Sequence, residues 1–206
     1  MSIETPRSTN CGLPSAVEWA HLVIEERVQA SSWVVDATVG NGHDTLFLAN
    51  LVGPTGLVFG YDIQERALET ARQRLDGAGV EEARCTLLCA SHESLTDTLP
   101  HEWRGRVQAV MFNLGYLPGA DKTVITQTAQ TLRAIRSALD WLAVGGVMTV
   151  VVYPGHAGGD EEAEAVRRFG ASLRIAEVEV QQLRPVNRSA NPPECWVFLK
   201  RAMAEN

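Results

Sequence analysis

Short apolar runs alternate with segments of helical periodicity along almost the whole chain. The runs predict strands at 33–36, 56–62, 85–89, 107–112 and 147–153. Apolar residues recur at helical spacing over 14–30, around 46–51, and over 64–78, 132–142 and 160–169. Because this repetition of strand and helix is typical of βα units, it predicts a mostly parallel sheet covered by helices on both faces.

The end of the chain departs from this alternation. Two further strands are predicted near 174–182 and 195–200, joined by a long polar loop at 184–194. Two strands without an intervening helix predict an antiparallel hairpin. Gly145 and Gly146 are predicted to end the helix before the strand at 147–153. The expected fold is therefore a doubly wound α/β sheet of seven strands, with a C-terminal antiparallel hairpin.

Composition narrows the classes of protein that the chain can belong to. A net charge of −7 over 206 residues argues against a wide nucleic-acid-binding surface, but not against a small basic patch. Residues 1–7 lack the pattern of a signal peptide, so we expect a cytoplasmic protein with no membrane contact. The four cysteines include no Cys-x-x-Cys pair, and the five histidines no zinc-binding motif, so no metal is predicted.

The predicted strand ends carry the residues that indicate a ligand. Gly40 and Gly42 follow the first strand, and Asp62 ends the second, 22 residues beyond Gly40. That spacing is typical of an acid that binds a ribose diol. A dinucleotide site would have a third glycine where Thr45 stands, and Asp44 would repel a phosphate. The pattern favours S-adenosylmethionine, although a tight turn without a ligand would need similar glycines.

The third and fourth strand ends add candidates for the cofactor and the substrate. Ser91 and His92 stand where such folds contact adenine, although His92 could equally cap a helix. Asn113-Leu-Gly-Tyr116 resembles the Asn/Asp-Pro-Pro-Tyr turn of amino-methylating enzymes, with leucine and glycine in place of the prolines. In that turn the Asn side chain and a backbone carbonyl hold the target nitrogen, while the aromatic ring stacks on a base.

Several motifs together are similar to the MnmM-type tRNA wobble-uridine methyltransferase family, formerly labelled "putative rRNA methylase". The resemblance covers roughly residues 14–200 and rests on 36–45, 60–64, 91–92, 113–122, 153–156 and 187–193. It departs from the family pattern at Ala120 and at Pro154. It implies S-adenosylmethionine-dependent methylation of the aminomethyl group of 5-aminomethyl-2-thiouridine at the wobble position. The implied partner is a tRNA anticodon loop, and a homodimer is left open.

The resemblance implies one methyltransferase domain over 1–206, with an N-terminal helix at about 14–30, a cofactor-binding half at about 33–112 and a substrate half at about 113–200. The expected cofactor-binding residues are Asp36, Thr38, Gly40, Asn41, Gly42, Asp44, Thr45, Asp62, Ile63, Gln64, Ser91, His92, Asn113 and Leu114. The expected catalytic residues are Asn113, Tyr116, Tyr153 and His156. The expected substrate-binding residues are Gly115, Tyr116, Asp121, Lys122, Arg184, Asn187, Arg188 and Asn191.

Other functions fit parts of the pattern. The substrate could be another RNA base or a small amine, and a nicotinamide-dependent oxidoreductase or a non-catalytic nucleotide-binding module would also use the glycine turn. Individual residues have purely structural interpretations too. Lys122 could be a helix-start surface residue, Tyr153 a core aromatic and His156 a loop cap.

Overall fold

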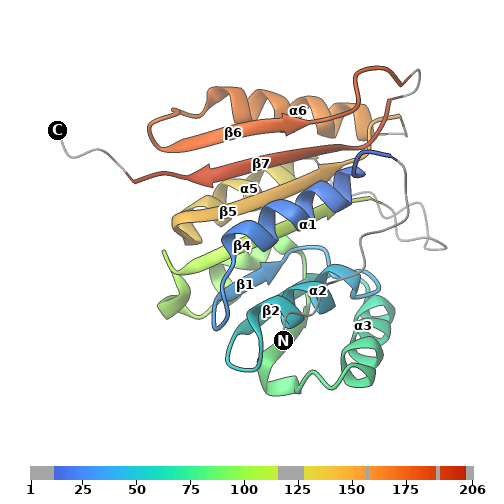
Figure 1. Cartoon of the computed structure of the whole chain (residues 1–206), viewed down its shortest axis with the longest axis vertical. Coiled ribbons are helices and arrows are strands. Elements are labelled where there is room, and N and C mark those ends of the chain that lie inside the picture. The colour runs from blue at the N-terminus through green and yellow to red at the C-terminus, as the bar shows by residue number, and fades with distance from the viewer. Residues whose placement is uncertain (1–11, 116–127, 156–157, 189–190, 203–206) are drawn as a thin grey trace.

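The computed structural model describes residues 12–115, 128–155, 158–188 and 191–202, and it contains a seven-stranded sheet (Figure 1). The strand order is β3-β2-β1-β4-β5-β7-β6. Strands β1 to β5 pair in parallel, whereas β7 pairs antiparallel with both β5 and β6. This topology confirms the predicted doubly wound sheet with its C-terminal hairpin. The strands are β1 (Trp33–Asp36), β2 (Leu57–Asp62), β3 (Cys85–Cys89), β4 (Val107–Leu114), β5 (Leu142–Val152), β6 (Val178–Leu183) and β7 (Glu194–Lys200).

Helices cover both faces of the sheet and divide the apolar interior into two main clusters. The described helices are α1 (Ala16–Arg27), α2 (His43–Val52), α3 (Glu65–Gly77), α4 (Leu95–Thr98), α5 (Thr128–Trp141) and α6 (Gly159–Ser172). One cluster contains apolar side chains of α1 and α2, and the other contains those of α5 and α6. Figure 1 shows α1 in front of β5 and α5 behind it. Burial on both faces accounts for the continuously apolar strands.

Helix α1 has a well-defined start at the edge where the parallel strands end. The Ser15 hydroxyl accepts a hydrogen bond from the Glu18 N–H, and the Glu18 carboxylate accepts one from the Ser15 N–H. This capping box satisfies two backbone donors that the first turn would leave unpaired. Ala20 and Ile24 are fully buried against the sheet. The cap and this packing together fix which side chains α1 directs at the strand ends.

The prediction that Gly145 and Gly146 end a helix is wrong. Helix α5 ends at Trp141, and both glycines lie inside β5, which begins at Leu142. The register between β4 and β5 shifts next to Val107, and Gly145 has a φ of 79°. A Cβ on Gly146 would lie 3.0 Å from the Val107 carbonyl oxygen. The glycines therefore permit an irregular strand start, and the sequence pattern alone does not distinguish this from a helix stop.

Two further observations bear on the predictions from composition. Within the described segments, no helix is both long and apolar enough to cross a membrane. Of the described cysteines, Cys85 and Cys195 are buried, and burial raises the pKa of both thiols to about 12. These two thiols are protonated core side chains. Cys89, in the same apolar run as Cys85, is exposed at the end of β3 and is not part of the core.

Candidate functional site

Hydrogen bonds to the buried side chain of Asp36 stabilise the loop after β1. This side chain is fully buried, and its two oxygens accept hydrogen bonds from the Thr38 N–H at 3.0 Å and the Thr45 hydroxyl at 2.6 Å. Burial, together with the nearby charge of Asp44, raises the pKa of Asp36 to about 7. Asp36 therefore ties the loop to the first turn of α2.

Asp62 joins the turns that follow β1 and β2. Its carboxylate accepts hydrogen bonds from the Gly40 N–H at 2.8 Å and the Gln64 N–H at 2.9 Å. A carboxylate has about four acceptor positions, so acceptor capacity remains for a ligand. The next residue, Ile63, is 51% exposed, which is unusual for a large apolar side chain beside a charged one. The pair offers an acceptor for a diol beside an apolar contact for a planar ring.

Helix α3 packs closely against the glycine turn, and this contact leaves no room for a side chain at Gly42. Gly42 has a φ of 77°, and a Cβ at this position would lie 2.7 Å from the Cβ of Ala71. The Arg74 guanidinium donates a hydrogen bond to the Asn41 carbonyl at 2.8 Å. The turn is therefore held by α3 as well as by Asp62, and the glycine permits its positive φ and this close approach of the two elements.

His92 lies beneath the same turn with one ring nitrogen unsatisfied. Its Nδ1 is 3.2 Å from the Ala37 carbonyl oxygen, to which it can only donate. No described residue forms a hydrogen bond with the buried Nε2. Burial lowers the pKa of His92, which favours the neutral ring, and Nε2 is then an acceptor with no donor among the described residues. The neighbouring Ser91 caps the short helix at 92–94 by accepting a hydrogen bond from the Glu93 N–H.

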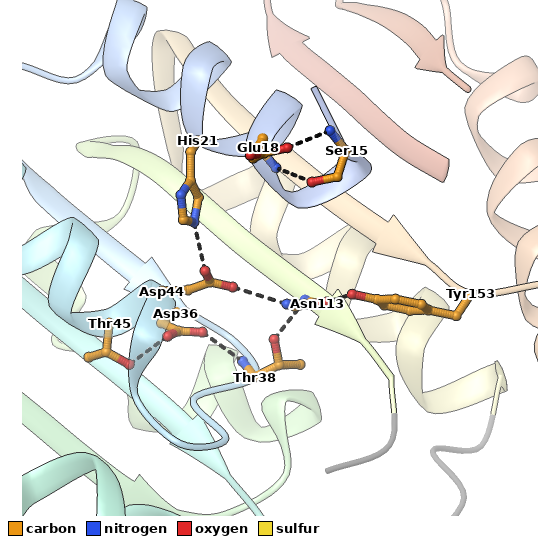
Figure 2. A network of polar contacts seen from close by, with 9 residues as sticks. All are labelled: Ser15, Glu18, His21, Asp36, Thr38, Asp44, Thr45, Asn113 and Tyr153. Carbon is orange, nitrogen blue, oxygen red and sulfur yellow. Dashed lines mark hydrogen bonds and ion pairs between the residues drawn. The ribbon is translucent and has the colours of Figure 1, made fainter. Parts of the chain in front are cut away.

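A polar network crosses the strand ends on the other side of the turn (Figure 2). His21 Nε2 lies 2.7 Å from Asp44 Oδ1, and Asn113 Nδ2 donates to Asp44 Oδ2 at 3.2 Å. The Tyr153 hydroxyl donates to Asn113 Oδ1 at 2.7 Å, and the Asn113 N–H donates to the Thr38 hydroxyl at 2.7 Å. The network joins α1, α2, β4 and the end of β5. It brings together two of the predicted catalytic residues, Asn113 at its centre and Tyr153.

Sequence reasoning missed His21 as a member of this network. The residue follows the helical spacing of the apolar face of α1, which gave it the appearance of a packing residue. In the structure its ring stacks on Phe47, with centroids 4.0 Å apart and planes at 5°. Phe47 lies one turn beyond Asp44 on α2, so one helix supplies both contacts of the imidazole. In the sequence, the position of His21 one helical turn after Glu18, in a Ser-x-x-Glu capping pattern, was the signal that could have placed it near the strand ends.

The fourth strand end brings further predicted residues to the network. Leu114 is buried, whereas Gly115 is exposed and lies against the ring of Tyr153. A Cβ on Gly115 would be 3.1 Å from the Tyr153 ring, so the close approach favours glycine. The predicted residues Tyr116, Asp121, Lys122 and His156 lie outside the described residues.

The loop between β6 and β7 reaches the same edge of the sheet. Asn191 donates a hydrogen bond to Asp160 at 3.1 Å, and the same carboxylate oxygen accepts one from the Gly155 N–H just after β5. Arg184 pairs with the buried Glu194 at 3.2 Å, which offsets part of the positive charge predicted for substrate binding.

Asn187 and Arg188 are exposed on this loop. No ion pair of Arg188 with a described residue is found. Within the described part of the chain, no cluster of histidine, cysteine and acidic residues could hold a metal ion.

Comparison with known proteins identifies the family. A sequence profile described as "Putative rRNA methylase" matches residues 58–199. The chain belongs to this family. A chloroplastic tRNA (mnm(5)s(2)U34)-methyltransferase from Arabidopsis thaliana is 39% identical over 194 residues, covering 91% of this chain and 70% of the relative.

Two solved structures are similar over nearly their whole length. A "putative rRNA-methylase" from Clostridium thermocellum has 36% identity and a TM-score of 0.86, covering 92% of this chain and 99% of that one. A "putative methyltransferase" from Streptococcus mutans, solved in complex with SAH, has 33% identity and a TM-score of 0.81 with the same coverage. This member of the rRNA methylase family is a methyltransferase, and these relatives do not support a nicotinamide oxidoreductase.

The family match places the network in relation to the shared region. Asn113 and Tyr153 lie inside the matched residues 58–199, whereas His21 and Asp44 precede them. The Arabidopsis relative aligns over 91% of the chain, so its similarity extends beyond the region that the family profile matches. The polar network of this methylase therefore combines residues from inside and outside the matched region.

Proposed function

We propose that this protein uses S-adenosylmethionine to methylate the aminomethyl nitrogen of 5-aminomethyl-2-thiouridine at the wobble position of tRNA. The observation that carries the proposal is Asn113, held at the end of β4 by hydrogen bonds with Asp44, Tyr153 and Thr38, the last of which lies in the loop that follows β1. The name of the Arabidopsis relative supports the substrate, and the SAH-bound structure supports the cofactor.

The described residues fit this cofactor by the chemistry of their atoms. Asp62 retains acceptor capacity for the ribose hydroxyls, and the exposed Ile63 beside it can pack on the adenine ring. The buried Nε2 of His92 has no donor among the residues that the structure describes, and we infer that a bound ligand supplies one. When bound, S-adenosylmethionine supplies an electrophilic methyl group on a positively charged sulfur. Asp36, Thr38 and Thr45 form hydrogen bonds that hold the turn in place.

The substrate side of the site must hold an uncharged amine with its lone pair facing the methyl group. Tyr153 has a raised pKa, because it is largely buried and Asp44 is nearby, so its hydroxyl stays protonated and donates to Asn113. The same hydroxyl oxygen can accept a hydrogen bond from the amine. Orientation of this kind can contribute roughly 7 kcal/mol to the lowering of a barrier without a covalent intermediate. Transfer forms the N–C bond, breaks the S–C bond, and leaves one ammonium proton to be lost.

Nucleoside mass spectrometry tests the assignment directly. The purified protein is incubated with isotope-labelled S-adenosylmethionine and tRNA that carries 5-aminomethyl-2-thiouridine. We expect one labelled methyl group on the wobble nucleoside and none on control tRNA that carries unmodified 2-thiouridine at that position. No label on the aminomethyl nucleoside, with the cofactor still bound, would overturn the tRNA substrate and leave the cofactor assignment standing.

A further inference from the structure

The position of His21 on helix α1 is fixed by the start of the helix and by two side-chain contacts. The capping box formed by Ser15 and Glu18 fixes the first turn of α1, and the imidazole stacks flat on Phe47. Its Nε2 points at Asp44 Oδ1, 2.7 Å away (Figure 2). The His21 side chain is 28% exposed, whereas that of Asp44 is only 9% exposed. An imidazole held this firmly against a buried carboxylate restricts the rotation of that carboxylate.

The orientation of the Asp44 carboxylate determines the orientation of the Asn113 amide and of the Tyr153 hydroxyl. An ionised carboxylate only accepts hydrogen bonds, so the Asn113 amide must present Nδ2 to Asp44 and Oδ1 to Tyr153. The Tyr153 hydroxyl must then donate to Oδ1, and its oxygen lone pairs point away from the amide. A rotated Asp44 would remove the group that prevents the Asn113 amide from flipping. The direction in which the Tyr153 hydroxyl donates its hydrogen bond therefore depends on the contact between His21 and Asp44, which acts through Asn113.

We propose that His21 is a positioning residue for methyl transfer, acting through Asp44 and Asn113 on the hydroxyl of Tyr153. The proposal rests on the proposed function, because it assumes that Tyr153 and Asn113 receive the amine. In this proposal His21 acts through its contact with Asp44 and not by a contact of its own with the amine or the cofactor. Its loss should slow the chemical step, since a misplacement of about 1 Å can cost about 100-fold in rate, while binding is retained.

Two substitutions separate the hydrogen bond from the stacking. His21→Phe keeps a ring on Phe47 but removes the donor to Asp44, whereas His21→Gln keeps an N–H near the position of Nε2. We expect His21→Phe to lower single-turnover methylation about 10- to 100-fold, with SAH affinity and the tRNA concentration dependence changed less than about twofold. His21→Gln should restore the rate to within about threefold of wild type. His101→Phe, at an exposed histidine far along the chain, is the matched control and should behave as wild type.

A second measurement does not depend on the substrate. The side-chain amide signal of Asn113 in a ¹⁵N-correlated NMR spectrum, identified by its loss in Asn113→Asp, reports the hydrogen bond to Asp44. We expect this signal to shift and broaden in His21→Phe and to return in His21→Gln. Wild-type methylation by His21→Phe, an unchanged amide signal, or a loss of SAH affinity equal to the loss of rate would each overturn the proposal. Failure of the wild-type enzyme on tRNA would instead overturn the proposed function, because the amide signal still tests the role of His21.

Discussion

Two aspartates at neighbouring strand ends have different environments. Each oxygen of both carboxylates accepts one hydrogen bond from the protein, but Asp36 is fully buried, whereas Asp62 is only half-buried and its remaining acceptor positions can reach a ligand. Burial without a cation raises the pKa of Asp36 to about 7. Spacing along the sequence cannot separate these two roles, since each aspartate simply ends an apolar run. The difference depends on how deep each strand end lies.

Asp36→Asn should change how stability depends on pH. The folded pKa of Asp36 lies above its ordinary value of 3.8, so the folded protein loses stability as the pH rises from about 4 to about 7. Asparagine mimics the protonated acid, because it accepts from the Thr38 N–H and donates to the Thr45 hydroxyl. Urea unfolding near pH 6 and near pH 8 should show the variant gaining about 1 kcal/mol over wild type across that interval. A difference that does not change with pH would mean that Asp36 ionises normally in the folded protein.

The contact between the glycine turn and α3 is a property of two elements. Gly42 and Gly79 both have positive φ, 77° and 73°, but only Gly42 faces another element, at 2.7 Å from the Ala71 Cβ. Alanine at positive φ costs about 1–2 kcal/mol, and overpacking adds about 1–3 kcal/mol. We expect urea unfolding of Gly79→Ala to show only the cost of alanine at positive φ. Gly42→Ala should show both costs, and it should also weaken SAH binding because α3 must move from the turn.

Equal stability of the two alanine variants would show that α3 adapts to a side chain at Gly42 without strain. Unchanged SAH affinity in a destabilised Gly42→Ala protein would separate the packing role of α3 from ligand binding. Both variants replace a glycine by the same residue at a similar φ, so their difference reports the contact with Ala71.

At the level of elements, most of the fold was predictable from the sequence, because buried parallel strands are nearly continuous apolar runs. The strand at Cys85–Cys89 has the predicted bounds, and Asp62 and Asn113 lie at strand ends as expected. The prediction from Gly145 and Gly146 was wrong, because the end of a helix and an irregular strand start both favour glycine. His21 was missed for another reason. Its partner Asp44 is 23 residues away, and only the packing of α1 on the sheet brings the two together.

At the scale of the whole molecule, an acidic chain must find local positive charge to bind a polyanion. The net charge is −7, so the overall field opposes RNA. The loop between β6 and β7 lies at the carboxyl edge of the parallel strands, where Asn191 contacts Asp160 near the end of β5. Of its two described arginines, Arg184 is paired with Glu194 and Arg188 has no described ionic partner. The proposed tRNA contact therefore depends more on Arg188 than on Arg184.

Arg188→Ala should weaken tRNA binding in a way that depends on salt. Each lost phosphate contact lowers the slope of log affinity against log salt by about 1, because fewer counterions are released on binding. Arg174→Ala is the control, since Arg174 is also exposed but pairs with Glu177 at 3.1 Å and precedes β6, at the opposite end of the strands. Binding measured at several salt concentrations should show a smaller slope for Arg188→Ala only. Equal slopes for both variants would mean that the RNA contacts positive charge elsewhere on the protein, and that the loop between β6 and β7 does not hold a phosphate.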